Sequence, residues 1–177
     1  AALPLVYRAE PVEKPMNFID DTAVPAEMLG DYIAGLRAIF ARHRTRYVIF
    51  GHAGNGNVHV TPLMDPHEAT FAARMAAMTD EAFELTWRLG GTITGEHGDG
   101  VLRAPYLRRQ YPNAYPVMVA VKRAFDPDGI LNPGSVVTDE RVFPERLLRF
   151  TNTFVATGTV FDDPEYRAMI EHCHGCG

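Results

Sequence analysis

The fold is decided by the stretch Tyr47-Val-Ile-Phe-Gly-His-Ala-Gly-Asn-Gly-Asn-Val-His-Val60, in which two apolar runs flank Asn55-Gly56. Asn-Gly between two such runs is the strongest short-range signal of a β-hairpin with a type I′ turn. A two-residue turn there would pair His52 with His59 across the strands. Directly opposed side chains share one face of a sheet, with Cβ atoms roughly 4.5–5.5 Å apart. The pattern predicts two imidazoles that converge on one metal ion, and the alternative is a pair of partly exposed strand histidines.

Amphipathic helices are predicted on both sides of this hairpin. The first covers residues 25–43, where Pro25 suits the first helical position and apolar residues recur at Leu29, Tyr32, Leu36, Ile39 and Phe40. The second follows Asp65, a candidate cap, with Pro66 at its first position and Glu68 completing a capping box. Its apolar face comprises Phe71, Met75, Met78, Ala82, Leu85 and Leu89, and Gly90-Gly91 ends it. A methionine-rich stripe of this kind is typical of a core.

The remaining segments complete an α+β pattern. Strands are expected at 47–50, 57–63 and 91–96, a further helix at 112–125, and irregular to extended chain at 1–23. The order of elements predicts a mostly antiparallel sheet with helices packed on one face, as in ferredoxin-like domains. Periodicity fades from about residue 138, which predicts an extended C-terminal arm. We therefore expect a domain over residues 1–137 and a linker over residues 138–177.

Composition excludes several classes of protein. The 177 residues are 46% hydrophobic, enough for a core, and the formal charge of −5 without a basic block argues against nucleic-acid binding. No apolar run approaches the ~20 residues of a membrane span, and no secretory segment opens the chain. Two cysteines exclude a disulfide scaffold and favour a reducing compartment. We therefore expect a cytoplasmic protein, with a peripheral location at the inner membrane as the alternative. Because Ala1 is not an initiating methionine, we expect the chain to begin within a longer protein.

A second cluster of chemically competent residues lies in Thr94-Gly-Glu-His-Gly-Asp-Gly100, after the third predicted strand. Glu96 would complete a set of two histidines and one carboxylate, which leaves coordination positions open for substrate. Its neighbour His97 could act as a base beside the metal. The alternative is a capped loop with a solvated Glu-His pair at the surface.

The glycine-rich stretches do not predict a dinucleotide site. Neither Gly54-Asn-Gly56 nor Gly98-Asp-Gly100 fits the G-x-G-x-x-G fingerprint, and no phosphate-cradling loop is visible. A cofactor such as FAD therefore cannot be held fully by this chain in the usual way.

Three motifs in series resemble one known family: Gly51–His59, Gly95-Glu-His-Gly98 and Phe125–Gly134, the last ending in Asn-Pro-Gly. Asp20-Asp-Thr-Ala-Val-Pro25 also resembles that family's acidic E-D-x-A-V-P signature. The chain is similar, over residues 8–137, to the C-terminal domain of FAD-linked oxidases of the vanillyl-alcohol oxidase superfamily. Glycolate oxidase D subunits, D-lactate dehydrogenases and D-2-hydroxyglutarate dehydrogenases belong to that group.

The resemblance implies a role for each matching residue. His52, His59 and Glu96 correspond to the ligands of a divalent metal, zinc or manganese, and His97 corresponds to the base. Asn132 corresponds to a residue that approaches the flavin, although Asn-Pro-Gly is also a strong turn former.

Two further residues correspond to positions that contact the substrate in the family. Arg8 corresponds to a carboxylate-binding arginine, with a surface arginine as the alternative, and Thr61 stands where some relatives have a substrate-contacting asparagine. Asn55 replaces the family's usual aspartate, a change that concerns only the turn.

The activity implied is oxidation of a small 2-hydroxy acid, with FAD held mostly by an N-terminal domain that this chain lacks. Cys173-His-Gly-Cys176 resembles the start of a ferredoxin-type cluster motif, which needs four thiolates, so we expect a following iron–sulfur domain with a 4Fe-4S cluster, or another electron acceptor. A chance C-x-x-C or a thiol redox pair is the alternative reading of the two cysteines. For the whole chain, the other candidate functions are a metal-dependent hydrolase with the same three ligands and a non-catalytic, metal-stabilised interaction domain.

Overall fold

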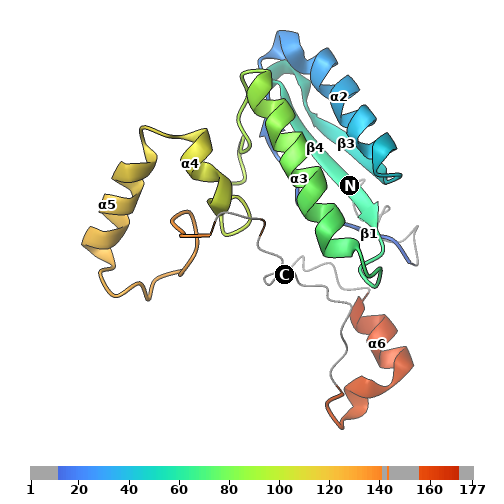
Figure 1. Ribbon diagram of the computed structural model, residues 1–177. Helices are drawn as coiled ribbons and strands as arrows, with labels where there is room; N and C mark the ends of the chain where they lie inside the picture. The colour runs from blue at the N-terminus through green and yellow to red at the C-terminus, as the bar shows by residue number, and fades with distance from the viewer. Residues whose placement is uncertain (1–11, 141–142, 144–155, 172–177) are drawn as a thin grey trace.

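The computed structural model describes residues 12–140, 143 and 156–171. Its centre is an antiparallel sheet in which β4 (Asn57–Met64) pairs along one edge with β3 (Arg46–His52) (Figure 1). The other edge of β4 pairs with two short strands, β1 (Lys14–Pro15) and β2 (Thr22–Ala23). Every residue of β4 is buried, as expected for a strand with neighbours on both sides.

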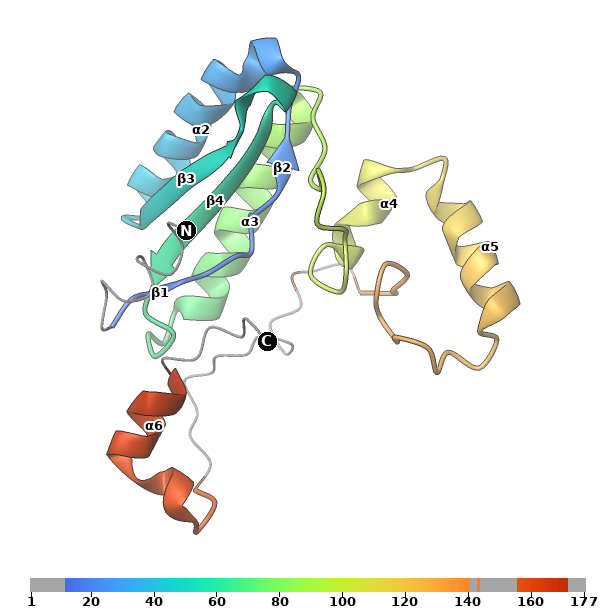
Figure 2. The ribbon, with the colours of Figure 1, turned by 180° about the vertical axis from the view of Figure 1, so that it is seen from behind.

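Helices α2 (Leu29–Arg42) and α3 (Phe71–Arg88) lie side by side across one face of this sheet, while the opposite face carries no helix from the described part of the chain (Figure 2). The predicted α+β class, with helices on one face of an antiparallel sheet, is confirmed. The other helical segments are η1 (Ala26–Met28), η2 (Ala53–Asn55), η3 (Ala104–Tyr106), α4 (Leu107–Gln110), α5 (Tyr115–Phe125), η5 (Val160–Asp162) and α6 (Pro164–Glu171). The arm predicted beyond residue 138 thus contains a helix that the sequence pattern did not predict.

The core fills the space between the sheet and the two helices. Its fully buried side chains include Phe18, Tyr32, Leu36, Phe40, Val60 and Met78, and the methionine stripe of α3 lies in it as predicted. A second, smaller cluster of Phe83, Ile93, Leu107 and Tyr115 joins α3 to α4 and α5. Among the helices of the described residues, none combines the length and apolar composition needed to cross a bilayer.

The predicted start of the second helix is wrong. The helix begins at Phe71, and Thr70 before it makes no capping hydrogen bond. Asp65 accepts the backbone N–H of His67 at 2.9 Å, so its carboxylate closes a turn two residues ahead. Glu68 pairs with the Arg74 side chain and does not complete a capping box.

The predicted hairpin exists, but its turn and register differ from the expectation. His59 pairs with Phe50, and His52 pairs with Asn57, so the connection is four residues long, Ala53–Gly56. The pairing of the two strands is therefore shifted by two residues from the pairing that a two-residue turn would give. Because side chains alternate with a period of two, a two-residue shift keeps each side chain on its face. His52 and His59 are therefore diagonal neighbours with ring centroids 5.5 Å apart, and their predicted proximity survives.

The wider turn is explained by a contact outside the hairpin. Gly56 has a left-handed φ of +66°, and its carbonyl accepts the Val24 N–H at 3.0 Å. A Cβ on Gly56 would lie 1.8 Å from the Val24 carbonyl oxygen, so only glycine allows this approach. The loop is thus shaped by the segment that follows β2.

The strand predicted over residues 91–96 is also wrong. It contributes one isolated bridge, in which Thr92 and Ala23 exchange hydrogen bonds of 2.8 and 2.9 Å. Beyond Thr92 the backbone N–H groups donate to side chains: that of Ile93 to Gln110 Oε1, that of Thr94 to the Thr92 hydroxyl, and those of the next three residues to the Asp21 carboxylate. They therefore cannot form a ladder. The edge of β4 opposite β3 is formed instead by β1 and β2, whose two residues each are too few to show a periodic pattern.

Candidate metal centre

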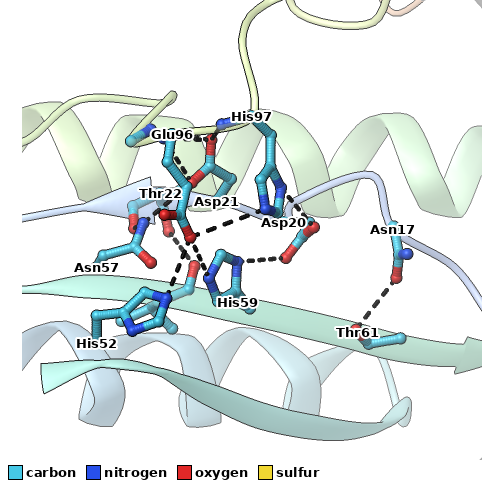
Figure 3. A network of polar contacts seen from close by, with 12 residues as sticks. Asn17, Asp20, Asp21, Thr22, His52, Asn57, His59, Thr61, Glu96 and His97 are labelled. Atoms are coloured by element: carbon cyan, nitrogen blue, oxygen red, sulfur yellow. Dashed lines mark hydrogen bonds and ion pairs between the residues drawn. The ribbon is translucent and has the colours of Figure 1, made fainter. Parts of the chain in front are cut away.

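The site lies on the face of the sheet that carries no helix. Val58 and Val60 of β4 enter the core with the helices, so the alternating residues Asn57, His59 and Thr61 point the other way. His59 and Thr61 are nevertheless buried, because the chain between β1 and β2 and the loop after Thr92 lie across this face (Figure 3).

The side chains of His52, His59 and Glu96 converge at one point (Figure 3). Glu96 Oε1 lies 3.2 Å from His52 Nε2 and 3.1 Å from His59 Nε2. Two ligand atoms that share a metal ion at about 2.1 Å are separated by roughly 2.9–3.4 Å, so both distances fit one coordination sphere. His97 Nε2 is farther from the same oxygen, at 3.8 Å. The structure brings all four residues together.

The loop bearing Glu96 is organised by a carboxylate, Asp21, to which sequence analysis assigned no role. Asp21 is fully buried and accepts the backbone N–H groups of Gly95, Glu96 and His97 at 2.7–3.0 Å. The amide of Asn57 donates to it at 3.0 Å. Burial alone would raise the pKa of Asp21, but these donors outweigh burial and hold its pKa below the usual value.

Asp21 also lies within 4.8 Å of ligand atoms of His59, Glu96 and His97, yet its role differs from theirs. Each of its oxygens already accepts at least two hydrogen bonds, so its lone pairs are occupied. We therefore exclude Asp21 from the ligand set and include His52, whose Nε2 faces Glu96.

Arg103 links the segment that carries Asp20 to the loop that carries Glu96 and His97. Its buried guanidinium donates to the carbonyl of Ile93 at 2.9 Å, to that of Gly98 at 3.2 Å, and to the carbonyl of Asp20. Burial lowers the pKa of Arg103, an effect that the neighbouring carboxylates of Asp21 and Asp20 oppose, and the group stays protonated.

The donor set fits a divalent cation such as zinc or manganese. Two imidazole nitrogens and one carboxylate oxygen are the ligand types of catalytic metal sites that leave a position open. Asn57 adds an observation of a second kind, because its Oδ1 is buried beside His52 and has no hydrogen-bond partner among the described residues. A buried acceptor without a donor is costly, so this atom fits a water or hydroxyl held at the site.

Thr61 and Asn132, two further predicted site residues, are not part of this cluster. Thr61 lies on the same face of β4, where its hydroxyl donates to Asn17 Oδ1 at 3.1 Å, to one side of the histidines (Figure 3). Asn132 has a left-handed φ of +44° and lines a groove of about 650 Å³ along α5. Arg8, Cys173 and Cys176 lie outside the described residues.

Sequence reasoning missed Asp20, Asp21, Asn57 and Arg103. The adjacent acidic pair within Phe18-Ile-Asp-Asp-Thr-Ala-Val24 was a usable signal, because carboxylates inside an apolar run are rarely buried without partners.

This fold and this cluster define an α+β domain with a two-histidine, one-carboxylate centre. Residues 2–136 match the family described as FAD linked oxidases, C-terminal domain. The chain belongs to that family, as the motifs predicted.

Curated relatives agree with this assignment. D-2-hydroxyglutarate dehydrogenase of Pseudomonas putida is 40% identical over 134 residues, which are 76% of this chain and 13% of that protein. Glycolate oxidase subunit GlcD of Bacillus subtilis is 38% identical over 137 residues, 75% of this chain and 29% of that protein. D-lactate dehydrogenase of Anaerostipes hadrus is 35% identical over 118 residues, 66% of this chain and 25% of that protein. The chain thus spans less than a third of the length of each.

Proposed function

We propose that this chain forms the metal- and substrate-binding part of an FAD-dependent 2-hydroxy-acid dehydrogenase. The observation that carries the proposal is the convergence of His52 Nε2 and His59 Nε2 on Glu96 Oε1 in a domain of the FAD-linked oxidase family. The substrates named for the three relatives, D-2-hydroxyglutarate, glycolate and D-lactate, all carry a hydroxyl group next to a carboxylate. These two groups can chelate one cation.

The ligand residues and His97 have separate roles in this proposal. A zinc or manganese ion held by His52, His59 and Glu96 would supply positive charge that favours ionisation of the substrate hydroxyl. His97 takes that proton on Nε2, which fits its position beside the cluster and its greater distance from Glu96 Oε1. FAD, when bound, would supply the acceptor for the hydrogen of the hydroxyl-bearing carbon and its electron pair, so that the product would be a 2-oxo acid.

Metal content tests the ligand assignment. Protein purified without a metal-affinity tag should contain about one zinc or manganese ion per chain, since the three ligands form one site. His59→Ala should lose this metal. His67→Ala, a matched control on the turn after β4 and outside the cluster, should retain it. Equal metal content in the His59→Ala variant and the wild type would refute the ligand assignment.

The role of His97 is tested by His97→Gln in the full-length enzyme. Glutamine keeps approximate size and hydrogen bonding but cannot take the proton, and loss of a general base costs on the order of 10²–10⁴ in rate. We expect normal metal content and a turnover reduced by that factor. Near-normal turnover in the metal-loaded variant would show that another group is the base.

The reaction class is tested by flavin spectroscopy. Full-length protein should lose its oxidised-flavin absorbance when glycolate, D-lactate or D-2-hydroxyglutarate is added without an acceptor. The 177-residue chain by itself should not retain FAD through gel filtration, because its glycine stretches contain no phosphate-binding fingerprint. Hydrolysis of model esters together with an unchanged flavin spectrum would favour the metal-dependent hydrolase instead.

The iron–sulfur hypothesis for Cys173 and Cys176 needs its own measurement. Full-length protein should contain about four iron ions and four sulfides per cluster if these thiolates open a ferredoxin-type motif. Iron content that is unchanged in a Cys173→Ser, Cys176→Ser variant would refute it.

A further inference from the structure

One carboxylate in the site contacts two histidines from the side away from Glu96. Asp20 Oδ1 lies 3.0 Å from His59 Nδ1, and Asp20 Oδ2 lies 3.3 Å from His97 Nδ1. The two imidazole rings are stacked, with centroids 4.9 Å apart and an angle of 18° between their planes. Each oxygen of Asp20 thus faces a different ring (Figure 3).

This contact decides which ring nitrogen carries hydrogen. An ionised carboxylate only accepts hydrogen bonds, so the Nδ1 atom that faces it is the N–H donor. In a neutral imidazole the other nitrogen, Nε2, then keeps its lone pair. His59 Nε2 lies 3.1 Å from Glu96 Oε1, so it keeps its lone pair only when a metal ion lies between the two atoms. His97 Nε2 lies 3.8 Å from the same oxygen, beyond hydrogen-bonding distance, and keeps its lone pair without a metal.

The main chain of Asp20 is fixed independently of its side chain. Arg103 donates to its carbonyl oxygen, and the next residue, Asp21, is fastened to the loop of Glu96 and His97 by backbone hydrogen bonds. The Asp20 side chain therefore extends from a fixed backbone, which limits the positions that its carboxylate can take. An acceptor restrained in this way orients a ring at little entropic cost.

We infer that Asp20 is a positioning residue that fixes His59 and His97 in the Nδ1–H tautomer at the same time. With one oxygen it prepares His59 to bind the metal, and with the other it prepares His97 to take the substrate proton. The inference rests on the proposed function for the meaning of these two roles and for the tautomer of His59, because without a metal Glu96 Oε1 would accept a hydrogen from its Nε2. The tautomer of His97 does not depend on the metal.

Asp20→Asn provides a sharp test, because asparagine offers one acceptor and one donor where aspartate offers two acceptors. In zinc-loaded protein His59 Nε2 binds the ion, so its buried Nδ1 carries the hydrogen. This N–H donates to the single side-chain oxygen of the asparagine. The amide N–H₂ then faces His97 Nδ1, and His97 must move its hydrogen to Nε2. Two-bond ¹H–¹⁵N correlation spectra of the histidine rings distinguish the two tautomers.

Three further variants complete the experiment. Asp20→Glu keeps two acceptor oxygens and should restore the Nδ1–H tautomer of His97. Asp20→Ala removes both acceptors and should weaken zinc binding roughly 10- to 100-fold, the usual effect of losing such a partner. Asp99→Asn is the matched control, since that carboxylate accepts from the Thr94 hydroxyl and not from a histidine. It should leave both the zinc affinity and the tautomers unchanged.

The outcomes separate this inference from the proposed function. An unaltered His97 tautomer in Asp20→Asn, or zinc affinity within twofold of wild type in Asp20→Ala, would overturn the role of Asp20. Failure of the wild-type protein to bind zinc would instead refute the metal centre. The tautomer of His97 could then still be read in the metal-free protein at alkaline pH, and Asp20→Ala, which offers neither histidine an acceptor, would decide the inference there: an unaltered His97 tautomer in that variant would overturn it.

Discussion

Replacing Asp21 with alanine should destabilise the protein more than any other single change in the acidic pair. The carboxylate is the acceptor for three consecutive backbone N–H groups, those of Gly95, Glu96 and His97, and for the amide of Asn57. Alanine leaves these donors without their partner. It also places a Cβ without a polar group at a backbone φ of +71°, a region that aspartate and asparagine tolerate better.

The magnitude follows from the kind of hydrogen bond that is lost. A hydrogen bond to a charged group contributes about 1.5–3 kcal/mol, and contributions within one network are not additive. Relief from burying the carboxylate offsets part of the sum, so we expect a loss of about 3–5 kcal/mol, the range for removing one partner from a buried charged network. For a protein of this size that corresponds to a fall in Tm of about 6–20 °C.

Urea denaturation followed by circular dichroism measures this loss. Asp21→Asn keeps one oxygen for the backbone donors and should be destabilised by less than the alanine variant. The contrast variant is Asp20→Asn, whose carboxylate faces histidine side chains, and its free energy of unfolding should stay within about 1 kcal/mol of wild type. An unfolding free energy of Asp21→Ala within that same margin would refute the view that Asp21 organises the loop.

Three more predictions concern the stability of the fold. Gly56→Ala should lower the free energy of unfolding by more than about 2 kcal/mol in urea, because its Cβ would collide with the backbone carbonyl of Val24 at a left-handed φ; an unaffected variant would contradict the observed turn. Met78→Ala should cost about 2–5 kcal/mol in the same assay, since this fully buried side chain leaves a cavity, and a cost below 1 kcal/mol would place Met78 outside the core. The Lys122 ammonium and two backbone N–H groups hold the pKa of Asp126 below its usual value, so its stabilising contribution is complete above the unfolded pKa of about 3.9 and is lost as pH falls through the lower folded pKa. Asp126→Asn should weaken the pH dependence of stability in that acidic range, and an unchanged dependence would argue against the contact.

Local patterns were sufficient to predict the elements whose signals lie within a few residues of one another. The periodicity of α2 and α3 follows from contacts three and four residues apart, and the sequence around Asn55-Gly56 identified the hairpin. The proximity of His52 and His59 was predicted although the register was wrong, because a shift of two residues preserves the face. Sequence motifs also grouped Glu96 and His97 with these histidines.

Tertiary structure alone decided how the loops over the sheet are held. Asp21 and the backbone of His97 are 76 positions apart, and Asp20 and Arg103 are 83 apart. No periodic pattern connects residues at such separations. The same distance effect explains why the strand predicted at 91–96 does not form: Ile93 donates its N–H to Gln110, and Gly95 and Glu96 donate theirs to the buried carboxylate of Asp21. A backbone donor pairs with whichever acceptor packing brings to it, and that choice is made only when the chain has folded.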